Sequence, residues 1–330
     1  QTVTFTNGSS GNTADIYHGK QGKGLKNFAR GVAVNTAMTT SQLRLSVSGQ
    51  SGFKFDNVNA HTPSVDTVNS TTFVYNDANQ LTSSVTSGAT TTYAYDTWGR
   101  LASRTADSYS ATYGWRFGDK LKSVTSTFPG ESASVAYNYD GLGKRRNKMV
   151  NGGPAMTWWR WGLGWETLAQ YNDSDSDWDI EGFAQFNVVK DFMHPLAEAA
   201  VPTGQTPANA TYSHLALDHL ASTRTVFNQT KAQTASMEFY PYGQRLSTSG
   251  TLPYNQFTAK PYDTEDGLYY FPYRYYAPAM ARWTKTDPIG LIDGPNVYGY
   301  VKGRPTCHRD PLGLQIESIP QWLSLFLDLK

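Results

Sequence analysis

A short aromatic-acidic unit recurs along the first half of the chain and limits its fold more than any other feature. Units begin at Phe55, Tyr75, Tyr95 and Trp115, with a spacing of 20 residues, and a slightly longer step leads to Tyr139. Most of them place Asp or Asn directly after the aromatic residue, then a turn, then a basic residue or Gln and a Leu. Alternating segments separate these heads. A repeat of this length fits two short strands and two turns.

The repeat predicts an all-β fold of stacked antiparallel hairpins. Alternation with a period of two puts the aromatic side chains on one face of a sheet, and Asp, Asn and Gly adopt the turn dihedral angles. No unit can bury its apolar face alone, so neighbouring units must stack. We divide the chain into lead-in strands at 1–54, hairpin repeats with a loop insert at 55–211, a core at 212–314 and an apolar tail at 315–330. The segments Val3–Thr6 and Leu43–Val47 are the expected lead-in strands.

Composition excludes several classes of function. The chain carries 28 Lys and Arg against 27 Asp and Glu, which argues against a nucleic-acid partner. No apolar run approaches the length of a membrane span, about 20 residues. The lone Cys307 cannot form an internal disulfide and is expected to be a small core residue rather than a nucleophile. The histidines show no metal-binding spacing, and we expect no metal and no cofactor. Because the chain opens at Gln1, we expect a processed form or a fragment.

Two copies of Asp-Pro-x-Gly-Leu lie near the end of the chain. One begins at Asp287 and the other at Asp310, 23 residues later. Proline fixes its own φ and restricts the residue before it, so each carboxylate is held on stiff backbone. Two fixed carboxylates are the minimum equipment for acid/base chemistry on a peptide bond.

Three other motifs suggest sites, and each has a structural interpretation that we favour. The acidic run 173–181 resembles a calcium loop but has the wrong residues at the sixth and twelfth positions, so we expect a hairpin tip. Asp218 and His219 suggest a hydrolase pair, but no nucleophile elbow accompanies them, so we expect a turn or core-network element. The glycine-rich segment 19–24 lacks both phosphate-loop spacings and is expected to be a basic turn.

From residue 212 onward the chain resembles the core of RHS (YD-repeat) proteins. Ala221 stands where that family usually has Gly, and Ala277 where it has Asp. The similarity is tight over about 100 residues and extends more weakly back to about residue 55. The matching segments are Leu217–Arg224, Tyr240–Gly243, Phe257–Tyr270, Arg274–Pro278, Arg282–Leu291, Asn296–Val301 and Asp310–Leu314.

The resemblance implies a β-sheet strip that spirals into a hollow shell, closed by a core that cleaves its own chain. Asp287 and Asp310 would form an aspartyl dyad, and Leu314–Gln315 would be the scissile bond. Activity on external substrates is not expected. Arg274 and Arg282 are candidates to position the dyad, although we favour a structural role for each. The family also implies secretion and a link to toxin or cargo enclosed in the shell.

The tail leaves two hypotheses open. Residues 315–330 carry both a helix-start pattern and a strand alternation, and they are too apolar to lie free in water. The first hypothesis is the C-terminal segment of a secreted RHS protein with a self-cleaving core. The second is a non-enzymatic extracellular or cell-surface protein that assembles into a homo-oligomer or filament through its tail or sheet edges. The expected partners are therefore its own C-terminal segment or neighbouring subunits.

Overall fold

A computed structural model describes residues 2–8, 11–18, 26–33, 71–128, 131–153, 156–175, 182–191 and 193–318. The chain forms two compact units, Gln1–Asn69 and Ser70–Lys330. In the first unit, β1 (Thr2–Gly8), β2 (Gly11–His18) and β3 (Lys26–Ala33) make an antiparallel sheet. The expected strand at Val3–Thr6 lies in β1. The segment Leu43–Val47, the unit at Phe55, the glycine-rich segment 19–24 and most of the tail lie outside the described residues.

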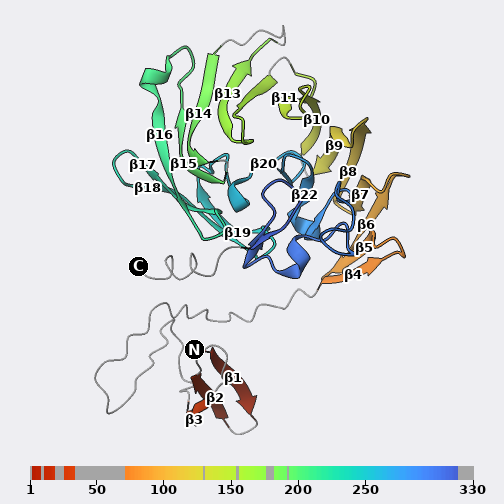
Figure 1. The fold of residues 1–330 in the computed structure, drawn as a ribbon, viewed down its shortest axis with the longest axis vertical. Helices are drawn as coiled ribbons and strands as arrows, with labels where there is room; N and C mark the ends of the chain where they lie inside the picture. The colour runs from red at the N-terminus through yellow and green to blue at the C-terminus, as the bar shows by residue number, and fades with distance from the viewer. Residues whose placement is uncertain are drawn as a thin grey trace. The chain divides into compact units, whose positions relative to one another are not determined.

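The second unit is dominated by one sheet of sixteen strands in chain order (Figure 1). Every strand pairs antiparallel with its neighbours along the chain, so the sheet is a continuous series of hairpins. Its two outer strands, β4 and β19, do not pair with each other. The strands are β4 (Thr71–Tyr75), β5 (Leu81–Thr86), β6 (Ala89–Tyr95), β7 (Leu101–Ala106), β8 (Tyr109–Arg116), β9 (Lys120–Phe128), β10 (Glu131–Tyr139), β11 (Arg145–Val150), β12 (Met156–Trp161), β13 (Thr167–Asp173), β14 (Gly182–Asp191), β15 (His194–Ala200), β16 (Thr211–Leu217), β17 (Thr223–Asn228), β18 (Gln233–Phe239) and β19 (Arg245–Gly250).

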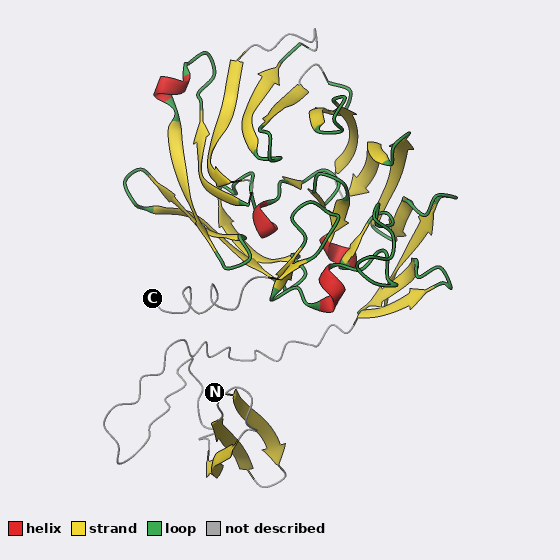
Figure 2. Ribbon diagram, in the orientation of Figure 1, coloured by secondary structure: helices red, strands yellow, loops and turns green. Residues whose placement is uncertain are grey.

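Residues 251–318, which follow β19 and which we call the inner segment, fold into small elements that pack inside the curve of the large sheet (Figure 2). The helices of the inner segment are single 3₁₀ turns, as is the earlier η1, so the prediction of an all-β fold is confirmed. The sheet runs past residue 212, where we placed the start of the core, and that division of the chain remains a prediction. The elements are η1 (Pro207–Asn209), η2 (Phe257–Ala259), β20 (Tyr262–Asp263), β21 (Leu268–Tyr270), β22 (Tyr275–Ala277), η3 (Pro278–Met280), β23 (Arg282–Trp283), η4 (Val301–Gly303), β24 (His308–Arg309) and β25 (Glu317–Ser318).

A side-chain oxygen organises five of the hairpin turns of the large sheet. Asp96 Oδ1 accepts hydrogen bonds from the N–H groups two and four residues later, both at 2.9 Å. Gly99, three residues after Asp96, has a φ of 75°, which suits glycine. The acidic or amide residue of the repeat therefore stabilises the hairpin turn through two side-chain-to-backbone hydrogen bonds. The same pair of bonds is made by Asn76, Asp140, Asp218 and Asn228.

Asp140→Ala is expected to lower the free energy of unfolding by about 1–3 kcal/mol, because it removes the acceptor of two backbone N–H groups. Asp107→Ala is the matched control, since Asp107 is exposed in a turn on the opposite edge of the sheet. Urea unfolding measures both. Equal losses in the two variants would show that the turn bonds contribute no specific stability.

The leucine of the repeat forms the core between the sheet and the inner segment. Leu81, Leu101 and Leu121 each follow their aromatic residue by six positions, and all three are fully buried. They belong to the cluster that also contains Leu268 and Tyr270 of β21. Burial of three such side chains contributes roughly 1.5–3 kcal/mol each. The repeat therefore encodes both the hairpin turn and the contact with the inner segment.

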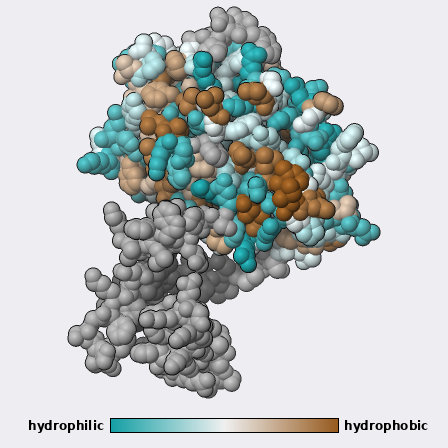
Figure 3. All heavy atoms as spheres, in the orientation of Figure 1, coloured by the Kyte–Doolittle hydropathy of each residue, from teal (hydrophilic) through white to brown (hydrophobic). Residues whose placement is uncertain are grey.

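Large apolar side chains remain exposed at successive turns on one edge of the sheet. Trp98, Phe117, Leu142 and Leu163 lie between β6–β7, β8–β9, β10–β11 and β12–β13. Their exposed fractions run from 74% to 103%, so most of the surface of each residue is open to solvent. Hydrophobic residues also gather in patches among hydrophilic ones on the face shown in Figure 3. Contiguous exposed apolar groups mark interaction surfaces more often than isolated ones do.

Candidate active site

The two Asp-Pro motifs meet at one buried guanidinium. Arg274 Nη2 lies 2.9 Å from Asp287 Oδ2 and 3.0 Å from Asp310 Oδ2. All three side chains are at most 5% exposed. Two carboxylates predicted to act together thus converge on the same nitrogen atom, in surroundings sheltered from bulk solvent.

Backbone contacts hold each member of this group. Arg274 Nε donates to the Gly313 carbonyl at 2.7 Å, and its guanidinium stacks over Trp283 at 4.1 Å from the ring centroid. The Asp287 N–H donates to the Val297 carbonyl at 3.0 Å, and Asp287 Oδ1 accepts from the N–H of Ile289. The site is therefore rigid on the side of both Asp287 and Arg274.

Asp310 reaches the residue at the predicted cut. Its Oδ1 accepts hydrogen bonds from the N–H of Gly313 at 2.8 Å and of Leu314 at 2.9 Å. Gly313 has a φ of 74°, so the chain turns back tightly toward the carboxylate. Leu314 and Gln315, the residues of the predicted scissile bond, follow directly. The second Asp-Pro motif therefore folds its own last residue onto its own aspartate.

Burial sets the proton affinity of the pair. Burial raises the pKa of Asp310 to about 6, although Arg274 and the two backbone N–H groups oppose the shift. The pKa of Asp287 is raised too, again by burial, with Arg274 opposing. A carboxyl group that exchanges its proton near neutral pH is suited to general acid/base chemistry.

The other candidate residues lie elsewhere. Arg282 donates to the Asn79 carbonyl at 2.7 Å and to Asn296 Oδ1 at 2.9 Å, and it does not contact either aspartate. Asp218 closes a hairpin turn, and His219 Nε2 lies 2.8 Å from the Thr306 carbonyl. Cys307, which we expected to be buried, is exposed because it lies in the turn before β24.

A second buried charge cluster was not predicted. Arg145 is fully buried, pairs with Asp263, and lies over the rings of Trp159 and Tyr270. Asp266 accepts a hydrogen bond from the Tyr137 hydroxyl at 2.8 Å. Burial, reinforced by the negative charge of Asp263, raises the pKa of Asp266 to about 8.

The sequence held one signal for this cluster. Arg145 follows Tyr139 by six positions and so occupies the place that Leu81, Leu101 and Leu121 fill in the earlier units. A charged residue at an inward position of a repeat predicts a buried partner. That partner, Asp263, lies 118 residues later, so its position could not be read from the repeat.

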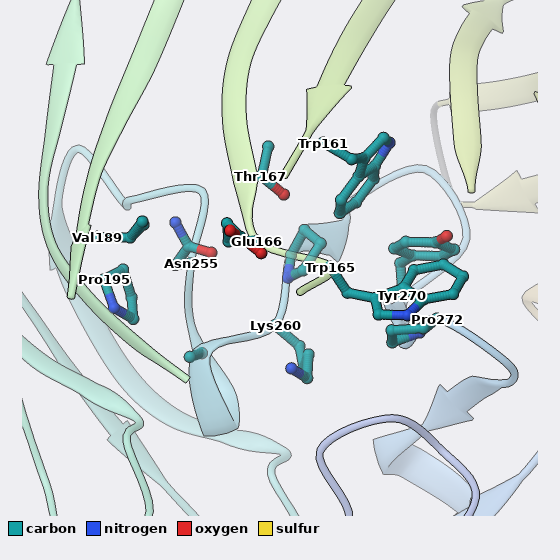
Figure 4. Close-up of a pocket in the computed structure, with 12 residues that line it drawn as sticks. Trp161, Trp165, Glu166, Thr167, Val189, Pro195, Asn255, Lys260, Tyr270 and Pro272 are labelled. Carbon is teal, nitrogen blue, oxygen red and sulfur yellow. The ribbon is translucent and has the colours of Figure 1, made fainter. Parts of the chain in front are cut away.

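One pocket of the described residues is separate from the dyad. It measures about 400 Å³ and lies between the β12–β15 part of the sheet and the inner segment around 255–272 (Figure 4). Trp161, Trp165 and Tyr270 lie toward one side of it, and Val189 and Pro195 toward the other.

The pocket also holds a buried lysine. Lys260 lines it, and burial lowers the pKa of this amine to about 7. None of Arg274, Asp287 and Asp310 lines the pocket.

Within the described ranges, no three His, Cys, Asp or Glu side chains gather in a way that would hold a metal ion. The same ranges contain no helix with the length and hydropathy needed to span a membrane.

Comparisons with known proteins agree with the repeat. The family model described as RHS Repeat matches residues 75–111, which contain the hairpins from the end of β4 into β8. Toxin protein Tse5 of Pseudomonas aeruginosa is 48% identical over 61 residues, covering 18% of this chain and 5% of that protein. Salivary gland surface protein 1 of Aedes aegypti is 34% identical over 109 residues, covering 32% of this chain and 3% of that protein.

Among solved structures, the crystal structure of TcdB2-TccC3 without its hypervariable C-terminal region aligns with a TM-score of 0.49 and 18% identity. The alignment covers 74% of this chain and 15% of that one. The chain thus spans only a small part of the relatives that it matches. The matched repeat and the hairpin turns that it encodes fall on the same residues, so residues 75–111 of this chain form an RHS repeat.

Proposed function

We propose that this chain is a segment of a secreted, toxin-related RHS protein whose core cleaves its own backbone between Leu314 and Gln315. One observation carries the proposal: Asp287 and Asp310 share Arg274 Nη2, and Asp310 also binds the N–H of Leu314. The identity to a toxin protein supports the toxin-related part. Enclosure of a toxin or other cargo by the curved sheet is part of the same proposal.

The reaction requires one proton in the carboxylate pair. The ionised carboxylate takes a proton from a water molecule, whose oxygen bonds to the Leu314 carbonyl carbon. The protonated carboxyl group donates to the carbonyl oxygen. Collapse of this intermediate breaks the C–N bond, and the nitrogen of Gln315 leaves with a proton. Because the peptide bond belongs to the same chain, effective concentration supplies much of the rate.

Arg274 has a definite part in this scheme. Two carboxylates beside one another do not both ionise easily, so the pair holds a proton into the neutral range. The guanidinium offsets part of that repulsion and fixes both carboxylates at one point. Its bond to the Gly313 carbonyl also fixes the residue before Leu314. Arg274 is therefore a positioning residue for both the dyad and the scissile segment.

Mass spectrometry of the purified protein tests the proposal. Cleavage reduces the intact mass of 36.5 kDa by the residues after Leu314. Asp287→Asn and Asp310→Asn each are expected to leave the chain uncut, because the amide cannot exchange the proton, while Asp107→Asn is cut as before. An intact mass in the wild-type protein and in all variants would rule out self-cleavage.

A second candidate function is a non-enzymatic extracellular or cell-surface scaffold that assembles with its own copies. The exposed apolar turns at Trp98, Phe117, Leu142 and Leu163 favour it, as do the outer strands β4 and β19, whose outer edges pair with no strand of the described residues. A relative that is named a surface protein fits it as well. The uncut outcome of the mass measurement is the result that this candidate requires.

A further inference from the structure

A small pocket with an excess of positive charge borders the dyad. It measures about 200 Å³ and is formed by the β8–β9 turn, the segment 270–275 and Lys285. Three of its lining residues are cations: Lys120, Arg274 and Lys285. Asp119 is the one carboxylate among the lining residues, and it is already paired with Arg100 at 3.1 Å.

Lys285 is the least satisfied of these cations. Its side chain is buried, with 5% of the residue exposed, yet it makes no hydrogen bond or ion pair with any described residue. The preceding residue is fixed, because the Thr284 N–H donates to the Tyr275 carbonyl and the Thr284 carbonyl accepts from Leu101. The ammonium group is therefore held at the pocket by a rigid backbone and lacks an acceptor there.

The other two cations also have donors to spare. Lys120 Nζ donates once, to the Pro272 carbonyl at 3.1 Å, and lies over the rings of Tyr139 and Tyr273. Arg274 Nη1 is buried and has no acceptor among the described residues. A buried guanidinium N–H without an acceptor is costly unless an anion pairs with it, and Lys285 Nζ keeps access to the pocket, where the same anion can reach it.

The proton affinities agree with this geometry. Burial lowers the pKa of Lys285 to about 8; Lys120, Arg274 and Arg100 act in the same direction, and Asp119 opposes them. Burial also lowers the pKa of Lys120, with Asp140 opposing, and that of Arg274, with Asp310 and Asp287 opposing.

We propose that the pocket at Lys120, Arg274 and Lys285 binds a small oxyanion, a carboxylate or phosphate group, through their free donors. A free ion and an acidic side chain of a bound peptide present the same chemistry to these donors. The pocket is small and opens to solvent, so it can take at most one small group and no nucleotide. The site is distinct from the dyad, although Arg274 belongs to both.

Occupancy of this pocket has a consequence for the dyad. The positive charge of Arg274 holds the pKa of Asp310 below the value that burial alone would give. An anion beside the same guanidinium offsets that charge, so the pKa of Asp310 rises further when the pocket is filled. Bound anion is thus expected to keep the dyad protonated to higher pH.

The test follows the side-chain carbon resonances of Lys285 and Asp310 by NMR while inorganic phosphate is added to the intact protein. Phosphate is expected to raise the pKa of both groups. A second titration uses a short capped peptide containing Glu, compared with its Gln counterpart, to separate a peptide carboxylate from a free ion. Lys285→Met is expected to weaken binding by about tenfold, the loss of one charged hydrogen bond. Lys122→Met, at an exposed position on β9, is the matched control.

The result that overturns the proposal is a Lys285 resonance that titrates identically with and without phosphate and with the Glu peptide. Equal weakening by Lys122→Met would also overturn it, because it would show diffuse attraction rather than a site. The wild-type titration decides the matter even if Lys285→Met does not fold. Binding is read independently of cleavage, so this inference and self-cleavage fail separately.

Discussion

Asp263→Ala is expected to lower the free energy of unfolding by about 3–5 kcal/mol, because it leaves Arg145 buried with no counter-ion. The two side chains pair directly, and each is at most 3% exposed. Arg145 and Lys148 together hold the pKa of Asp263 below its ordinary value, even though burial opposes them. The carboxylate is therefore ionised at neutral pH. Its removal leaves the positive charge of Arg145 unpaired at the contact between the sheet and the inner segment.

The double variant Arg145→Leu/Asp263→Asn is expected to recover most of this loss. Leucine at position 145 restores the residue that the repeat places at 81, 101 and 121. Replacing both members of a buried ion pair is often neutral or stabilising. Lys148 keeps its partner Glu265 at 3.0 Å.

Asp119→Ala is the matched control for the single variant. Asp119 also pairs with an arginine, Arg100, but about half of its side chain is exposed. Exposed pairs contribute about 0–1 kcal/mol. Urea unfolding compares the variants. A loss in Asp263→Ala no larger than that in Asp119→Ala would show that Arg145 does not depend on its partner.

Local sequence was sufficient for the hairpins and insufficient for the contacts between them and the inner segment. The aromatic–Asp turn can be predicted because its hydrogen bonds span only four residues, as at Asp96 and Asp140. The inward leucines follow from the same register. Arg145 takes the same inward position as these leucines, but its partner could not be predicted, since it is set by the packing of a segment 118 residues away.

The dyad was predicted from family resemblance, because no spacing rule brings residues 287 and 310 together. The structure places both carboxylates on Arg274, which was one of two arginine candidates. Residue type could not separate it from Arg282, since both are arginines that the fold buries. The distinction depends on the turn after Asp310, which brings the Gly313 carbonyl to Arg274 Nε. The anion pocket at Lys285 has no sequence signature, because its cations come from three separate segments.

The protein is expected to lose stability as the pH rises from about 4 to about 7. The pKa of Asp266 is raised from 3.8 to about 8 and that of Asp310 to about 6, both chiefly by burial. A raised pKa means that the folded state binds more protons than the unfolded state in that range. The stabilisation is therefore complete below about pH 4 and is lost as the pH rises through the folded-state pKa.

Other groups do not reverse the sign in this window. The pKa of Asp263 is lowered, so this group changes the stability only at pH values below about 4. Lys260 and Lys285, with folded-state pKa values of about 7 and about 8, are mostly charged in both states until the pH passes 7. Above that pH they oppose Asp266, and the decline is expected to flatten.

Urea unfolding at intervals between these limits measures the effect, with a slope of up to about 1.4 kcal/mol per pH unit for each proton. Asp266→Asn is neutral at every pH and keeps an acceptor for the Tyr137 hydroxyl. In this variant the free energy of unfolding is expected to depend less steeply on pH, by the contribution of one proton across the window. Asp310→Asn is expected to reduce the slope of stability against pH only below about pH 6, because Asp310 is ionised in both the folded and the unfolded state above its folded-state pKa. Asp107→Asn, at an exposed turn, is expected to leave the slope unchanged. A wild-type stability that rises over this range would mean that Asp266 is ionised inside the folded protein, and that the contact of the inner segment with β10 tolerates its charge.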